Sequence, residues 1–196
     1  MTPSARIPDN IKKVLKDLQK IAPCIVAGGA IRDTLNGRAI KDIDVFMDSA
    51  YEQAFKRSIN YQQWRKLGKQ DTEYKLANVV KDVYETNYGY DWPVQVIFCS
   101  IDPEEYVTRY FDFGICKTWY DGSHIHCHKD FVKDVNNKTI TMCLDEKAMN
   151  RAYPNVDYAL KHIKQHGERI RYKYPSFSIV MPESEATGLK TPLPAI

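Results

Sequence analysis

The sequence lacks several features that would assign it to a specialised class of protein. No apolar run approaches the roughly 18 consecutive residues of a membrane span, and residues 1–20 contain no apolar signal-peptide centre. We therefore expect a cytoplasmic protein without a membrane partner. The formal net charge of +3 is too small to indicate nucleic-acid binding by itself.

Cysteine pairs are also absent. The five cysteines are an odd number, stand singly in apolar or strand-like runs and form no C-x-x-C pair. This pattern indicates neither a zinc knuckle nor a disulfide framework, and most of the five are expected in the core. They are Cys24, Cys99, Cys116, Cys127 and Cys143.

The composition is that of an ordinary globular protein. Of 196 residues, 43% are hydrophobic and 27% are charged, which is enough for one substantial core. We expect residues 1–180 to form a single domain with its core at about 22–120. Residues 181–196 contain Pro, Ser and Glu without periodicity, which predicts a mobile tail.

Hydrophobic periodicity predicts alternating helices and strands, and hence an α/β or α+β fold with a mixed sheet flanked by helices. Segment 68–91 is polar and leaves helix or strand open at 78–84. A β-hairpin is expected within about 123–144, pairing 124–130 with 139–144, and a C-terminal helix at about 156–167. The other expected helices lie at 9–21, 30–36, 49–67 and 102–109, and the other strands at 24–27, 42–46, 94–98 and 115–120.

Two carboxylates alternate with apolar residues in the strand Asp42-Ile43-Asp44-Val45. In a strand, Asp42 and Asp44 point to the same face with Cβ atoms roughly 6.5 to 7 Å apart. Carboxylates so placed can share divalent cations, and a pair of Mg²⁺ ions supports displacement at phosphorus. The alternative is an exposed acidic strand face without a ligand.

A glycine pair precedes these carboxylates. Gly28 and Gly29 stand between a strand and a helix, where they let backbone N–H groups approach an anion, and Arg32 follows on the first helical turn as a cation for phosphate. The alternative is a plain turn. The order of strand, glycine pair, helix and DxD favours phosphate and metal chemistry over both alternatives.

These residues resemble the head-domain signature of the polymerase β-type nucleotidyltransferase superfamily. Gly28-Gly29-Ala30-Ile31-Arg32-Asp33, followed by Asp42-Ile43-Asp44, is similar to the G-G-x-V-R-D and D-x-D of bacterial-type tRNA nucleotidyltransferases and poly(A) polymerases. The resemblance implies that superfamily's mixed sheet, a nucleoside triphosphate donor, and Mg²⁺ or Mn²⁺ bound by Asp42 and Asp44. It also implies nucleotide contacts for Gly28, Gly29, Arg32 and Asp33.

A looser similarity lies at residues 110–116, which resemble the R-R-D-F-T-I-N segment of these enzymes. It implies that Asp112 contacts the nucleotide sugar or completes the catalytic site; an Asp that only satisfies backbone N–H groups at a helix–strand junction is the alternative. Gln95 departs from the family, which often has a third carboxylate on this strand. The E-D-x-x-R base-reading motif is missing, and 196 residues leave no room for the family's long helical body.

A basic run at 161–173 carries five cations and one anion, so it has a charge of +4 and the remainder of the chain sums to −1. Its cations are candidates for contacts with an RNA acceptor or with the triphosphate, and an ordinary solvated helix face is the alternative. They are Lys161, Lys164, Arg169, Arg171 and Lys173. His124, His126 and His128 alternate along a predicted strand, where a solvated face is favoured over a zinc site.

Two functions follow. The first is a Mg²⁺-dependent nucleotidyltransferase that moves a nucleotide from a triphosphate to an acceptor hydroxyl, either an RNA or tRNA 3′ end or a protein or small molecule, as in toxin-like members. The second is a catalytically impaired protein that binds a nucleotide or blocks a partner, with Gln95 as the sign of lost activity. The sequence leaves the oligomeric state open.

Overall fold

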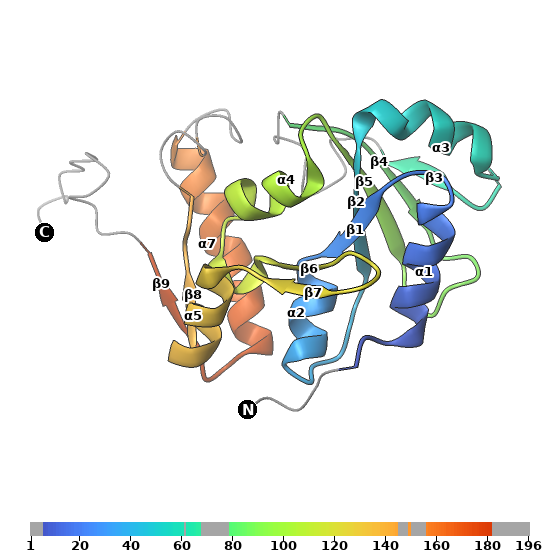
Figure 1. The fold of residues 1–196 in the computed structure, drawn as a ribbon. Helices are drawn as coiled ribbons and strands as arrows, with labels where there is room; N and C mark the ends of the chain where they lie inside the picture. Colours follow the sequence, from blue (N-terminus) through green and yellow to red (C-terminus); the bar gives the residue numbers. More distant parts are fainter. Residues whose placement is uncertain (1–5, 61, 68–78, 145–148, 150–155, 182–196) are drawn as a thin grey trace, which may run out of the picture.

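The computed structural model describes residues 6–60, 62–67, 79–144, 149 and 156–181. In this part of the chain a seven-stranded mixed sheet has the order β3-β4-β5-β2-β1-β6-β7, and a second sheet pairs β8 with β9 (Figure 1). This confirms the predicted α/β class with a mixed sheet flanked by helices. The strands are β1 (Cys24–Ala27), β2 (Ile43–Asp48), β3 (Arg65–Leu67), β4 (Val80–Thr86), β5 (Val94–Cys99), β6 (Thr118–Tyr120), β7 (Ile125–Cys127), β8 (Thr139–Thr141) and β9 (Ser178–Val180).

Strand β2 lies at the centre of the large sheet. It pairs in parallel with β5 and antiparallel with β1, and Ile43, Val45, Phe46 and Met47 are fully buried. Phe46 lies on the same sheet face as Asp44. The face that was expected to be acidic is therefore apolar from Phe46 onward. A strand buried on both sides is a rigid support for the carboxylates at its start.

Helices α1 (Asp9–Gln19), α2 (Gly29–Leu35) and α3 (Glu52–Ser58) contribute to the core on one face of the sheet. Helix α1 presents apolar residues at helical spacing, and all of them are buried, as the sequence predicts. These residues are Ile11, Val14, Leu15 and Leu18. Each buried aliphatic side chain of this kind contributes about 1.5–3 kcal/mol, so α1 is firmly attached.

Helix α4 (Pro103–Tyr110) covers the opposite face. Its N-terminus is capped by the Asp102 carboxylate, which accepts hydrogen bonds from the backbone N–H groups of Glu104 and Glu105. Tyr106 and Val107 pack on this face. Because the helix spans eight residues, it covers only part of the face.

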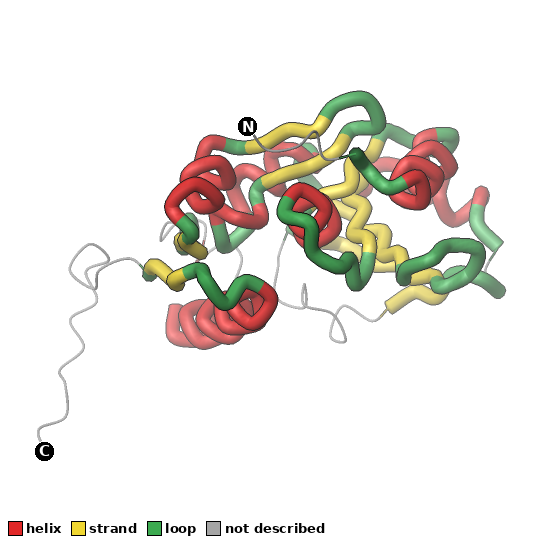
Figure 2. Tube along the Cα trace, turned by 90° about the horizontal axis from the view of Figure 1, so that it is seen from below, coloured by secondary structure: helices red, strands yellow, loops and turns green. Residues whose placement is uncertain are grey.

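A third cluster lies around α7 (Val156–Lys173), with the short helix η3 (Gly114–Cys116) and strands β8 and β9. In Figure 2, α7 runs along one side of the molecule beside this strand pair. Phe111 packs against both the α4 cluster and the α7 cluster. The loop after α4 therefore connects the large sheet to the C-terminal helix.

The hairpin expected from 124–130 and 139–144 is wrong. Residues between them form helix α5 (Lys129–Asn137), which the His128 side chain caps and the left-handed Lys138 ends. Phe131 and Asp134 are buried three residues apart, a helical spacing hidden by the turn-like composition of 134–137. The observed hairpin joins β6 to β7 through the Asp121–Gly122 turn.

Two expected helices have different lengths. The helix expected at 49–67 ends at Ser58, because a turn at Asn60 brings Trp64 back against Phe55 with ring centroids 5.2 Å apart. The C-terminal helix extends beyond 167 to Lys173. Gly167 does not end it: a Cβ at this glycine would lie 2.9 Å from Phe113 Cζ, so a close approach explains the residue.

The undecided segment 78–84 is strand from Val80 onward, as part of β4. The expected tail lies almost wholly outside the described residues, which end at Met181. Among the helices of the described part, none combines the length and apolar character that a membrane crossing requires.

Candidate nucleotidyl-transfer site

The glycine turn leads directly from β1 into α2. Gly28 has a φ of +73°, and a Cβ there would lie 3.2 Å from the ring of Phe111. Its N–H donates to the Thr118 carbonyl at 3.0 Å, and its own carbonyl accepts from Arg32 N at 2.9 Å. Since Gly28 N–H is already used, any phosphate contact at this turn falls to the residues that follow it.

Gly29 keeps the backbone close to a buried cation. Arg32 Nη2 lies 3.7 Å from the point where a Cβ on Gly29 would be. Arg32 is only 6% exposed, and its Nη1 donates to Cys116 Sγ at 3.3 Å. The positive charge therefore lies within the turn rather than on the protein surface. Burial raises the pKa of the Cys116 thiol to about 11, which keeps it neutral beside Arg32 at ordinary pH.

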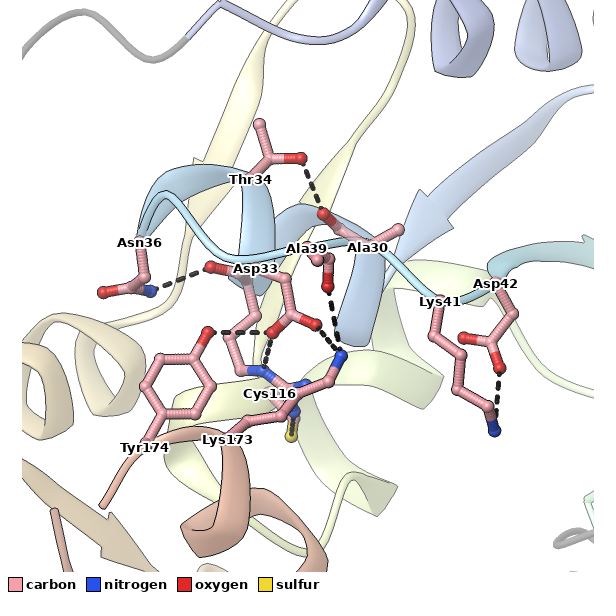
Figure 3. A network of polar contacts seen from close by, with 11 residues as sticks. Ala30, Asp33, Thr34, Asn36, Ala39, Lys41, Asp42, Cys116, Lys173 and Tyr174 are labelled. Carbon is pink, nitrogen blue, oxygen red and sulfur yellow. Dashed lines mark hydrogen bonds and ion pairs between the residues drawn. The ribbon is translucent and has the colours of Figure 1, made fainter. Parts of the chain in front are cut away.

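The two acidic residues occupy different positions at the start of β2. Asp44 is in the sheet, in register with Ala27 of β1 and Gln95 of β5, and is half-buried. Asp42 directly precedes the strand and is likewise half-buried, with Oδ2 3.6 Å from Lys41 Nζ (Figure 3). Because Ala27 directly precedes Gly28, the Asp44 carboxylate and the glycine turn lie at the same end of the sheet.

A row of polar side chains extends from Asp44 across three more strands. Gln95 on β5 is paired with Glu85 on β4, and Glu85 with Arg65 on β3. Gln95 Nε2 donates to Glu85 Oε2 at 3.1 Å, and Arg65 Nη2 to Glu85 Oε1 at 3.0 Å. The sequence missed Glu85, because it lies in the polar segment 68–91, directly after the residues 78–84 that the pattern left open between helix and strand.

Asp33 lies at the centre of the buried network in Figure 3. It is 1% exposed and accepts hydrogen bonds from Arg32 Nε at 2.7 Å, Lys173 Nζ at 2.6 Å and Tyr174 OH at 2.8 Å. Burial alone would raise the pKa of Asp33, but these three donors outweigh it and the pKa lies below its usual value. The network joins the signature helix α2 to the end of α7.

Two cations flank the ring that completes this network. The guanidinium carbons of Arg32 and Arg38 lie 5.4 and 5.6 Å from the centroid of the Tyr174 ring. Burial raises the pKa of Tyr174, so its hydroxyl remains a donor to Asp33. Sequence reasoning did not link Tyr174 to Asp33, because nothing local in the sequence connects the two residues.

Asp112 lies in the loop after α4, next to the glycine turn through its neighbour Phe111. It is 8% exposed, and its Oδ2 is 2.7 Å from Nδ1 of His166 on α7. Its backbone carbonyl accepts from Cys143 N at 2.7 Å. The side chain therefore binds a histidine rather than satisfying a local backbone N–H group. The sequence missed His166.

The basic run does not form one surface. Lys161, Lys164 and Arg171 share an exposed face at helical spacing, with Arg171 ion-paired to Glu168. Arg169 and Lys173 follow another face, and Lys173 is the half-buried partner of Asp33. One of the five candidate cations thus belongs to the buried network.

The histidines that were predicted to share one strand face have different roles in the structure. His126 pairs with Asp121 at 2.7 Å and stacks on Trp119 with ring centroids 5.1 Å apart, whereas His128 caps α5. Within the described ranges, no three His, Cys, Asp or Glu side chains form a group able to bind a metal ion.

The donor set at the start of β2 suits a hard divalent cation in kind. Asp42 and Asp44 supply carboxylate oxygens, and Gln95 adds a neutral amide oxygen on the adjacent strand. Mg²⁺ and Mn²⁺ prefer such oxygen ligands and keep several waters when few protein groups bind them. The residues present therefore fit a cation held by two carboxylates.

Comparison with solved structures identifies the class of fold. The Thermotoga maritima CCA-adding enzyme complexed with tRNA is similar over 93% of this chain and 42% of that chain, with 15% identity and a TM-score of 0.60. The Bacillus stearothermophilus CCA-adding enzyme in complex with CTP is similar over 91% of this chain and 42% of that chain, with 14% identity and a TM-score of 0.60. The chain has the nucleotidyltransferase fold and spans less than half the length of these enzymes.

Residues 5–138 match the model of the Gabija anti-defense 2 family. The chain belongs to this family, whose matched region contains the glycine turn, Asp42, Asp44 and Asp112. No curated protein sequence matches the chain.

Proposed function

We propose that this protein is a Mg²⁺-dependent nucleotidyltransferase that moves a nucleotide from a nucleoside triphosphate to an acceptor hydroxyl in the cytoplasm. The observation that carries the proposal is the pairing of Asp44 with Ala27, the last residue before the glycine turn. It brings a carboxylate and the glycine turn to one end of a rigid sheet. Such an arrangement suits phosphoryl chemistry, in which catalysis is mostly positioning and electrostatics.

Each candidate residue has a role in this proposal. Asp42 and Asp44 bind Mg²⁺ or Mn²⁺, Gly29 admits the triphosphate to the turn, and Arg32 supplies fixed positive charge beneath it. A bound cation supplies charge neutralisation at the phosphates and polarises the attacking hydroxyl. Asp33 positions Arg32, because its side chain accepts hydrogen bonds from buried or half-buried protein donors, Arg32 among them.

Asp112 is proposed to complete the site together with His166. The pair lies beside Phe111, which contacts Gly28, so it is adjacent to the turn that admits the nucleotide. The hydrogen bond to His166 orients the carboxylate. The exposed cations Lys161, Lys164 and Arg171 are proposed to contact an acceptor rather than the triphosphate, since they lie on the outer face of α7.

The acceptor is proposed to be a molecule whose modification counteracts the Gabija defence, as the family name suggests. The similar solved structures include a complex with tRNA, which favours an RNA 3′ end. A protein hydroxyl of the defence system is the competing acceptor, compatible with the same family. Incubation of α-labelled triphosphates and Mg²⁺ with either total RNA or a lysate containing the Gabija proteins separates the two.

Label on RNA or protein with the wild type, but not with Asp42→Asn plus Asp44→Asn, is the expected result. Asp9→Asn, on the exposed N-terminus of α1, is the control for loss of a carboxylate. Triphosphate binding without transfer to any acceptor would overturn the enzymatic proposal. It would favour instead a nucleotide-binding protein that blocks a partner, a second candidate supported by the neutral Gln95 beside Asp44.

A further inference from the structure

Glu85 and Gln95 form a polar pair on neighbouring strands of the large sheet. Gln95 lies between Asp44 on one side and Glu85 on the other, in a single row across β2, β5 and β4. Cross-strand partners in a sheet point to the same face, so all three side chains share the face of the proposed cation site. Strand β5 separates Glu85 from Asp44, so Glu85 lies on the side of Gln95 that faces away from Asp44.

The hydrogen bond between the pair determines which end of the amide is available. Gln95 Nε2 donates to Glu85 Oε2 at 3.1 Å. The reversed amide would place two acceptor oxygens together, which is repulsive, so the carboxylate selects this orientation. The amide nitrogen is therefore the end of Gln95 that is bound to β4, and the amide oxygen is the end that is available to another partner.

Glu85 is itself fixed from its other side. Arg65 Nη2 donates to Glu85 Oε1 at 3.0 Å, and the Glu85 side chain is 20% exposed against 74% for Arg65. The two carboxylate oxygens are thus engaged by two different strands. This gives a chain of contacts from Arg65 through Glu85 to Gln95 that ends at the cation site.

We propose that Glu85 is a positioning residue that turns the Gln95 amide oxygen toward Asp44, so that Gln95 serves as a neutral third oxygen ligand for the divalent cation. The inference rests on the proposed function, because it concerns the same site. It assigns a role to a residue on β4, one strand further from the carboxylates than Gln95. Groups that orient a metal ligand through a hydrogen bond typically contribute about 10-fold to 100-fold in metal affinity.

The test is the affinity for Mn²⁺ alone, measured from the electron paramagnetic resonance signal of free Mn²⁺, which requires neither acceptor nor turnover. Glu85→Leu removes the acceptor and is expected to weaken Mn²⁺ binding by about 10-fold. Glu85→Gln keeps an oxygen that can accept from Gln95 and is expected to retain wild-type affinity. Loss of charge alone would weaken both variants equally, and that result would overturn the proposed positioning.

Asp82 offers a matched control on the same strand. It is 22% exposed and ion-paired with Lys66 of β3 at 2.7 Å, but its partner on β5 is Phe98, on the opposite sheet face. Asp82→Leu is expected to leave Mn²⁺ affinity unchanged while disturbing a comparable ion pair. Equal weakening in Asp82→Leu and Glu85→Leu would overturn the inference in favour of general destabilisation.

Exchanging Glu85 and Gln95 tests the same contact in reverse. In the double variant Glu85→Gln plus Gln95→Glu the hydrogen bond is reversed and a carboxylate stands beside Asp44, so tighter Mn²⁺ binding than wild type is expected. If wild-type binding is abolished by Asp42→Asn plus Asp44→Asn but unaffected by Glu85→Leu, the inference fails and the proposed site stands. If wild type does not bind Mn²⁺, both fail.

Discussion

The hydroxyl of Tyr174 donates a 2.8 Å hydrogen bond to Oδ1 of Asp33, 141 residues earlier in the chain. The same oxygen accepts from Arg32 Nε, and Oδ2 accepts from Lys173 Nζ. A carboxylate that is 1% exposed is tolerated because all three donors surround it. These hydrogen bonds connect the end of α7 to α2.

Tyr174→Phe is expected to lower the free energy of unfolding by about 1–3 kcal/mol, because it removes a donor from a buried charged acceptor while leaving the ring in place. Urea titration followed by circular dichroism measures the change. Tyr172→Phe is the matched control, since Tyr172 lies two residues earlier, in the last turn of α7, and is 90% exposed. Equal stability of the two variants would contradict the importance of the hydroxyl.

The Asp121 turn predicts a dependence of stability on acid. Burial raises the pKa of Asp121, but hydrogen bonds from His124 N, the His126 ring and Ser123 N outweigh it and lower the pKa to about 2. The unfolded value is about 3.9. A folded-state pKa below the unfolded value contributes stability that is present above about pH 4 and is lost as the pH falls through about 2.

Asp121→Asn is therefore expected to be about 1–2 kcal/mol less stable than wild type at pH 7, after allowance for solvent screening. The difference should shrink below about pH 4 and vanish below about pH 2. Thermal or urea unfolding of both proteins over this range provides the measurement. A difference that stays constant down to pH 2 would show that the lowered pKa is not its source.

Gly167→Ala is expected to destabilise the protein by about 1–3 kcal/mol, the usual effect of overpacking a core. Its Cβ would lie 2.9 Å from Phe113 Cζ, and Phe113 is fully buried. At an open helical site the same change stabilises by about 1 kcal/mol, so the sign alone is informative. In a Phe113→Leu background the loss caused by Gly167→Ala should become smaller, as a double-mutant cycle can measure.

Asp44→Asn is expected to lower nucleotidyl transfer by about 100-fold or more, the effect of removing one group that stabilises transition-state charge. The assay is transfer of label from an α-labelled triphosphate at saturating Mg²⁺. Asp48→Asn is the control on the same strand, because Asp48 accepts from Ala50 N at the far end of β2. Comparable losses in both variants would point to damage to the strand instead.

The part of the site that the sequence predicts is local. The glycine turn, Asp42 and Asp44 lie within 17 residues, and the pairing of Ala27 with Asp44 supports their grouping. Strand and helix periodicities around them are strong, because β1, β2 and α1 bury continuous or regularly spaced apolar residues. Local patterns were therefore sufficient to predict the fold class.

The parts that sequence reasoning missed depend on distant contacts. Tyr174 meets Asp33 across 141 residues, and His166 meets Asp112 across 54, so no local pattern could indicate either pair. Glu85 lies on a strand whose burial alternates imperfectly because of a bulge between Val80 and Asp82. Helix α5 was misread because Asn and Asp favour turns, while its buried Asp134 accepts from Ile115 N.

The contacts at the end of α7 limit how far the chain can be shortened from its C-terminal side. The family match ends at residue 138, whereas the donors to Asp33 include Lys173 and Tyr174. A fragment trimmed to the matched region would leave Arg32 and Asp33 without the aromatic ring and ammonium that now enclose them. The smallest fragment that preserves the signature helix in its present surroundings must therefore extend through residue 174.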